Sequence, residues 1–127
     1  MKKIIKVLLF LLLSKASISQ HKSVLTVNEF EKAIQAKSVQ LIDVRTPQEF
    51  KEGYIKGAVN ADWQSGKQFA EEVKKLDKTK PVYLYCLSGI RSSKAADWLA
   101  ENGFAEVINL EGGIKAWKAA EKKVEVK

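Results

Sequence analysis

The sequence is poor in cross-linking and acid–base residues: its 127 residues include one cysteine, Cys86, and one histidine, His21. One cysteine cannot form a disulfide within the chain. A leftover thiol is typical of an intermolecular partner or of a deliberately reactive group. Because His21 stands at the start of the domain expected below, a protease-like cysteine–histidine pair is disfavoured. Activation of the thiol would then have to come from backbone dipoles and cations.

The N-terminus also lacks a run long enough to cross a membrane. Its apolar stretch from Val7 to Leu13 is far shorter than the roughly 20 residues that span a bilayer. Lysines precede this stretch and small polar residues follow it, which is typical of a secretory signal peptide. A buried N-terminal helix is the alternative, but the flanks show no amphipathic period. We therefore predict a signal peptide over residues 1–19 and an exported domain over residues 20–127.

Export implies a periplasmic or secreted protein with no membrane attachment after cleavage. The net charge of +7 is concentrated in residues 1–19, which hold four lysines and no acid, so the rest of the chain carries +3. The remaining lysines alternate with glutamates on predicted helix faces, as on a solvated surface. The charge therefore does not favour nucleic-acid binding. The length predicts a single domain, which we expect to be monomeric.

Strand and helix patterns alternate along residues 20–127. Thr26 and Thr46 each stand three residues before a glutamate, as in a capping box that starts a helix, and Pro47 suits a first helical position. Residues 53–63 are expected to be extended, and the charged segment 121–127 is expected to fray. Periodicity predicts helices over 66–76, 91–102 and 114–120, and strands over 39–44, 81–86 and 105–110. This alternation predicts an α/β fold with a mainly parallel sheet covered on both faces.

The segment VYLYCLSGIRSS places Cys86 at the carboxyl end of a strand, where sites lie in open α/β sheets. Four residues separate it from Arg91, which opens the next helix. Backbone N–H groups of a tight loop at a helix N-terminus can converge on one point, and there they would lower the pKa of a thiol. Gly89 permits a backbone that a Cβ would hinder, and Ser88 and Ser92 offer hydroxyl donors.

Two questions stay open on the residues alone. Arg91 can either pin the loop or bind an anionic substrate through two hydrogen bonds. Cys86 can be a nucleophile or a small buried hydrophobe that ends a core strand, and the spacing from cysteine to arginine does not decide between them.

Three segments, taken in order, resemble the rhodanese family of single-domain sulfurtransferases. They are LIDVRTPQEFKEGYIKGAVN, YCLSGIRSSKAADWL and LEGGIKAW, and the likeness extends over about residues 23 to 120. The resemblance implies a rhodanese-like three-layer sandwich, with a parallel five-stranded sheet between helices. It also implies that Cys86 is a nucleophile. The Cys86 thiolate would take a sulfane sulfur from a donor such as thiosulfate and pass it to cyanide or a thiol, including a thiol on a protein. No metal or organic cofactor is implied.

The resemblance assigns roles to the residues around Cys86 as well. Arg91 would shape the loop and attract an anionic donor, while backbone N–H groups would hold the persulfide sulfur. Asp43 and Arg45 match family positions, and we expect them to form a structural ion pair, since a buried charge needs a partner. Trp63 is expected either in the pocket wall or in the core. The loop residues expected to bind substrate are Leu87, Ser88, Gly89, Ile90 and Ser92.

Two other functions compete with sulfur transfer. Phosphatases and arsenate reductases of the same fold carry one more residue between cysteine and arginine, so the shorter loop here suits a single sulfur atom better than a tetrahedral oxyanion. Rhodanese-like domains that serve only as binding modules typically lack the cysteine, which this chain keeps.

Overall fold

A sheet of five parallel strands forms the centre of the computed structural model, which describes residues 21–127. The strand order across the sheet is β1-β5-β4-β2-β3, and every neighbouring pair is parallel. The prediction of an α/β fold with a parallel five-stranded sheet is therefore confirmed. The strands are β1 (His21–Leu25), β2 (Gln40–Asp43), β3 (Val59–Asn60), β4 (Val82–Tyr85) and β5 (Glu106–Leu110).

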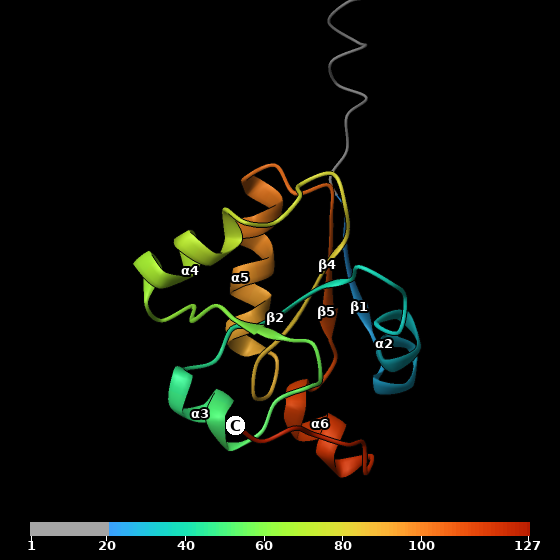
Figure 1. Ribbon diagram of the computed structural model, residues 1–127. Helices are drawn as coiled ribbons and strands as arrows, with labels where there is room; N and C mark the ends of the chain where they lie inside the picture. Colours follow the sequence, from blue (N-terminus) through green and yellow to red (C-terminus); the bar gives the residue numbers. More distant parts are fainter. Residues whose placement is uncertain (1–20) are drawn as a thin grey trace, which may run out of the picture.

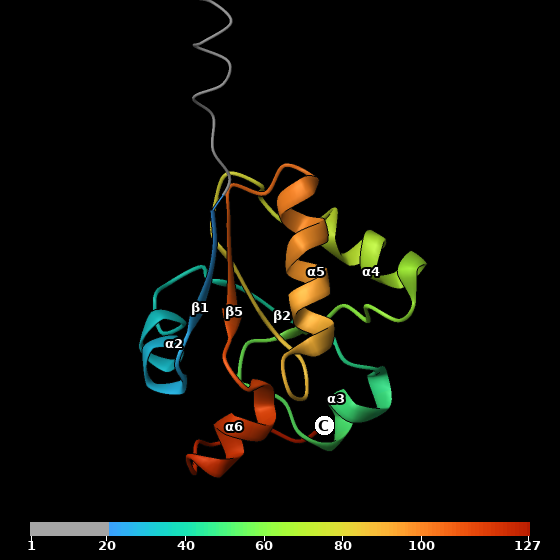
Figure 2. The same ribbon diagram turned by 180° about the vertical axis from the view of Figure 1, so that it is seen from behind.

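Helices cover both faces of this sheet. Helices α4 and α5 lie on one face, and α2 and α6 on the other (Figures 1 and 2). The short helix α3 lies at the end of the molecule where the C-terminus also lies (Figure 1). The helices are α2 (Val27–Ala33), α3 (Pro47–Glu52), α4 (Gly66–Val73), α5 (Ile90–Glu101) and α6 (Gly113–Ala119).

The strands alternate between two cores. Along β5, Val107 packs into the cluster beneath α4 and α5, whereas Ile108 packs into the cluster beneath α2 and α6. This is the two-residue period of a strand that is buried on both faces. Both cores reach to the carboxyl ends of the strands, and the loops that follow are therefore built on a rigid edge.

The two predicted capping boxes are present. The Thr26 hydroxyl accepts from the Glu29 amide at 3.3 Å, and the Glu29 carboxylate accepts from the Thr26 amide at 2.9 Å. Thr46 and Glu49 repeat this arrangement at the start of α3, with Pro47 in the first turn. Each box satisfies amide groups that a helix start would otherwise leave unbonded.

Strand β1 was not expected from the sequence. Its five residues show no apolar alternation, and Val24 is 61% exposed. What holds β1 is its parallel pairing with β5, from His21 against Glu106 to Leu25 against Leu110. An edge strand of this kind depends on a neighbour that is distant in the sequence, so local pattern cannot reveal it.

Some predicted boundaries differ from the observed ones. Helix α4 ends at Val73 rather than at Leu76, although Leu76 still packs against the core. Trp98 is only partly buried and packs edge-on against Phe69, with 5.5 Å between the ring centroids. Trp117 is buried.

The prediction that residues 121–127 fray is wrong. Tyr54 and Glu125 exchange two backbone hydrogen bonds of 2.9 and 2.8 Å, and the Lys127 amide donates to the Lys51 carbonyl. The Trp117 indole donates to the Lys123 carbonyl at 2.9 Å. The charged side chains of this segment predicted exposure to solvent, but its backbone is hydrogen-bonded to α6, to α3 and to the loop after α3.

Residues 1–19 lie outside the described residues, so the signal peptide and export stay predictions. Within residues 21–127, no helix is both long enough and apolar enough to cross a bilayer.

We predict that the two amide hydrogens that pair Tyr54 with Glu125 exchange slowly. The Tyr54 and Glu125 amides should exchange at least about ten-fold more slowly than the Lys123 amide, which donates to no described residue. Hydrogen exchange followed by NMR on the full chain would measure this difference. Equal rates at the three positions would show that the segment frays after all.

Candidate active site

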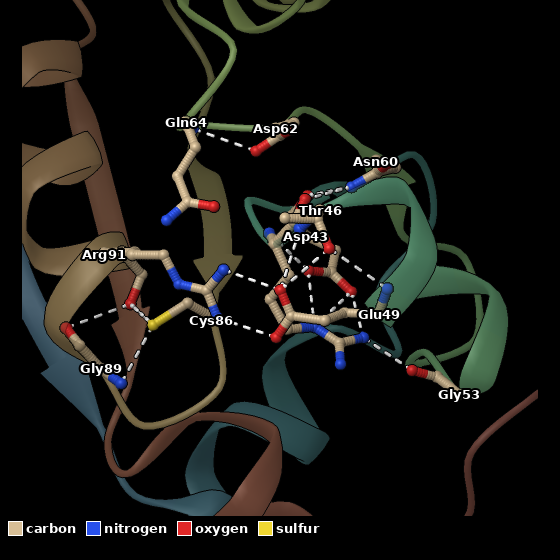
Figure 3. A network of polar contacts seen from close by, with 12 residues as sticks. Asp43, Thr46, Glu49, Gly53, Asn60, Asp62, Gln64, Cys86, Gly89 and Arg91 are labelled. Atoms are coloured by element: carbon tan, nitrogen blue, oxygen red, sulfur yellow. Dashed lines mark hydrogen bonds and ion pairs between the residues drawn. The ribbon is translucent and has the colours of Figure 1, made fainter.

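Cys86 lies directly after β4, at the carboxyl edge of the sheet, and is 1% exposed. Two hydrogen-bond donors point at its sulfur. The Gly89 amide donates to Sγ at 3.0 Å, and the Ser92 hydroxyl lies 3.3 Å from Sγ (Figure 3). The loop therefore curls around the sulfur, with donors directed inward.

Gly89 gives the loop this shape. It caps the N-terminus of α5 with φ +113°, a left-handed conformation that residues with a Cβ rarely adopt. A Cβ at this position would meet no other atom within 4 Å, so the requirement for glycine is conformational and not spatial. The left-handed turn leaves the Gly89 amide facing the sulfur.

Helix α6 fixes the other side of the loop. The Ile114 amide donates to the Cys86 carbonyl at 2.9 Å, and the Lys115 amide donates to the Leu87 carbonyl at 3.0 Å. Gly113 makes this approach possible, because a Cβ there would overlap the carbonyl oxygens of Cys86 and Leu87. The carbonyls next to the sulfur thus point to α6, where they cannot repel a thiolate.

This environment favours the ionised thiol. Burial raises the pKa of Cys86, but hydrogen bonds from the Ser92 side chain and from the amides of Ser92, Gly89 and Ser88 lower it by more. The net pKa lies below the ordinary value of a cysteine, and a larger fraction of Cys86 is therefore thiolate at neutral pH.

Arg91 already has a protein partner. Its Nη1 donates to Glu49 Oε1 at 2.8 Å and its Nη2 to Glu49 Oε2 at 2.9 Å, in a two-fold contact between α5 and α3. The hydrogen bond from Arg91 is the largest of the contributions that lower the pKa of Glu49 to about 2. Glu49 is therefore a carboxylate at neutral pH. It was expected only as a capping residue, and its contact with Arg91 had no signal in the sequence.

Asp43 and Arg45 form the buried ion pair expected beside the site. Arg45 Nη2 donates to Asp43 Oδ2 at 2.6 Å and to the Gly53 carbonyl at 2.6 Å, and both side chains are almost fully buried. The Asn60 side chain donates to the carbonyls of Asp43 and Arg45. These contacts join the end of β2 to α3 and β3, beneath the pair of Glu49 and Arg91.

The remaining predicted residues are placed as follows. Leu87 and Ile90 are 44% and 69% exposed, so only their backbone can belong to the loop interior. Trp63 packs edge-on against Phe69 at 5.0 Å, which places it with the core. His21 begins β1, at the amino edge of the parallel sheet and opposite the edge that carries Cys86.

Comparison with known proteins agrees with this architecture. A family model described as "Rhodanese-like domain" matches residues 26–120. The chain belongs to the rhodanese-like domain family. A crystal structure of a rhodanese-like domain protein from Staphylococcus aureus has a TM-score of 0.70 and 33% identity, and the match covers 84% of this chain and 98% of that one.

Two curated relatives carry different names. A protein of Shewanella oneidensis named thiosulfate sulfurtransferase GlpE is 38% identical over 96 residues, which cover 76% of this chain and 92% of that protein. A protein of Pelagibacter ubique named tRNA uridine(34) hydroxylase is 35% identical over 102 residues, which cover 80% of this chain but 34% of that protein. The rhodanese-like domain here thus spans nearly all of the first relative and about a third of the second.

Because α6 approaches the Cys86 loop closely at Gly113, we predict that a larger residue at this position destabilises the fold. Replacing Gly113 with alanine should lower the free energy of unfolding by more than about 2 kcal/mol, because φ is +62° and the new Cβ would overlap two carbonyl groups. The matched control is Gly66→Ala, where a Cβ meets nothing within 4 Å, and its effect should stay within about 0.5 kcal/mol. Urea unfolding measures both variants, and similar losses in the two would contradict this account of the α6 contact.

The hydrogen bond from Ser92 predicts a shift in thiol ionisation. Replacing Ser92 with alanine removes the donor at 3.3 Å and should raise the pKa of Cys86, so that alkylation by iodoacetamide rises at higher pH. The neighbouring exposed Ser93 is the control, and Ser93→Ala should keep the wild-type profile. An unchanged profile in Ser92→Ala would mean that the backbone amides alone set the pKa.

Proposed function

We propose that this rhodanese-like domain is a sulfurtransferase that carries sulfane sulfur as a persulfide on Cys86. The observation that carries the proposal is the donor-lined loop. The Gly89 amide and the Ser92 hydroxyl lie within hydrogen-bond distance of Sγ, the amides of Ser88 and Ser92 also lower the pKa of Cys86, and four residues separate Cys86 from Arg91. A loop of this size suits a single bound sulfur atom, and its N–H groups suit a negative charge.

With thiosulfate as the donor, the reaction has two steps. The Cys86 thiolate attacks the outer sulfur of thiosulfate, a new S–S bond forms, and the donor S–S bond breaks. Sulfite leaves with the electron pair as a dianion, and the persulfide keeps one negative charge. In the second step cyanide or a thiolate attacks the outer sulfur of the persulfide, and the Cys86 thiolate is the leaving group.

The protein contributes binding and electrostatics to these steps. The Gly89 amide and the Ser92 hydroxyl stabilise the thiolate before the attack, and the same loop offers donors to the terminal sulfur afterwards. Arg91, with its positive charge near Cys86, favours an anionic donor. The name of the relative GlpE, thiosulfate sulfurtransferase, supports this donor.

Mass spectrometry tests the proposal directly. After treatment with thiosulfate, the full chain should gain one sulfur, about 32 Da, and cyanide should remove it. Cys86→Ser should gain nothing, while Ser93→Ala should behave as the wild type. A wild-type protein that gains no sulfur, or an adduct that persists in Cys86→Ser, would exclude this mechanism. Hydrolysis of an aryl phosphate without sulfur transfer would instead support a phosphatase.

A further inference from the structure

Glu49 contacts the Arg91 side chain of the Cys86 loop, but it has no role in the mechanism proposed above. It stands at the third position of α3, and its carboxylate takes part in the capping box with Thr46. The same carboxylate accepts hydrogen bonds from both terminal nitrogens of Arg91. Glu49 therefore links a helix start that is fixed locally to a side chain of the Cys86 loop.

We infer that Glu49 is a positioning residue, which holds the Arg91 guanidinium beside Cys86 so that an anionic sulfur donor meets it in one fixed orientation. This inference rests on the proposed sulfurtransferase function. In the view of Figure 3, the guanidinium of Arg91 lies between Cys86 and Glu49, and the carboxylate faces its outer edge.

The geometry leaves Arg91 able to bind a donor while it stays bound to Glu49. A guanidinium has five N–H groups, and Glu49 occupies one on each terminal nitrogen. The three others are free of Glu49, and the Arg91 side chain is 21% exposed. The two alternatives of the sequence analysis, pinning the loop or binding an anion, are therefore compatible.

Glu49 is itself held in place before any donor binds. Its carboxylate accepts from the Thr46 amide at 3.2 Å and from the Thr46 hydroxyl at 3.1 Å. An arginine without such an anchor samples many rotamers and must lose that freedom when a ligand binds. Glu49 restricts the Arg91 side chain before the donor binds. Less side-chain entropy is then lost on binding, so the affinity for the donor should be higher.

Replacing the Glu49 carboxylate has two opposite effects on the affinity for an anionic donor, one through the charge of the pair and one through the orientation of Arg91. Removing the negative charge would draw an anionic donor more strongly, but the pair is partly exposed and solvent screens that gain. A glutamine keeps one acceptor oxygen and places an NH2 group where the second oxygen stood, so the two-fold contact is lost and the guanidinium is no longer fixed at both nitrogens. We expect the loss of orientation to dominate and to weaken donor binding.

The experiment is steady-state sulfur transfer from thiosulfate to cyanide by the full chain. In Glu49→Gln the KM for thiosulfate should rise about ten-fold while kcat stays within about two-fold, because Arg91 holds the donor in the ground state and in the transition state alike. Glutamine still supports a capping box, so the variant should fold, and a urea midpoint close to the wild type would confirm that it does.

Glu29→Gln is the matched control. Glu29 forms the same capping box with Thr26 at the start of α2, but its carboxylate contacts no arginine among the described residues. Its KM for thiosulfate should equal the wild-type value. A KM that rises equally in Glu29→Gln and in Glu49→Gln would overturn the inference, since the effect would then come from the cap.

Two further variants separate position from charge. Glu49→Asp keeps the charge but is one methylene too short to reach both nitrogens, so its KM should rise as in Glu49→Gln. A wild-type KM in Glu49→Asp would overturn the inference, because the charge alone would then account for the effect.

The double variant tests whether Glu49 acts through Arg91. Adding Glu49→Gln to Arg91→Gln should raise the KM for thiosulfate by less than about two-fold, and fully additive effects would contradict the inference. Failure of the proposed function looks different: the wild type would then form no persulfide at all.

Discussion

The direction of two carbonyl groups is the constraint on which the candidate site depends. The carbonyls of Cys86 and Leu87 are bonded to the amides that open α6, so the loop presents its N–H groups and not its oxygens to the sulfur. Sheet order makes this possible. Because β4 and β5 are parallel neighbours, the loop after β4 and the helix after β5 meet at the same edge. The environment of the Cys86 thiol is therefore a property of the tertiary fold, although the residues that donate to its sulfur are local.

Sequence patterns predicted the parts of the molecule that are decided locally. The capping boxes, the buried strands and the Cys86 loop each depend on residues within a few positions of one another. Strand β1 and segment 121–127 escaped prediction because their stability comes from partners distant in the sequence. His21–Leu25 needs the edge of β5, and Glu125 needs the backbone of Tyr54. The contact of Glu49 with Arg91 was not predicted for another reason: the capping box already accounted for a glutamate at this position.

Glu49 shows how one side chain can serve both the fold and the site. The capping box with Thr46 stabilises the start of α3 through Glu49 Oε1, and the same carboxylate fixes Arg91 through both of its oxygens. Beneath them, Arg45 joins Asp43 to the end of α3 through the Gly53 carbonyl. Movement of α3 would therefore disturb the guanidinium, while movement of α6 would disturb the loop backbone. Of the two short helices at the carboxyl edge of the sheet, α3 thus positions the Arg91 guanidinium and α6 positions the loop that carries the Cys86 thiol.

The same contacts limit the chemistry that the site can support. A phosphate monoester loses a basic alkoxide and needs a proton donor, whereas sulfite leaves thiosulfate as a stable dianion and needs none. Glu49 is a carboxylate held beside the Cys86 loop, and the hydrogen bond from Arg91 helps to lower its pKa to about 2, so it carries no proton at neutral pH. The hydrogen-bond donors to the sulfur are backbone amides and the Ser92 hydroxyl, and none of these groups gives up a proton at neutral pH. A site that stabilises anions without protonating them favours a reaction whose leaving group is already stable, and sulfur transfer from thiosulfate is such a reaction.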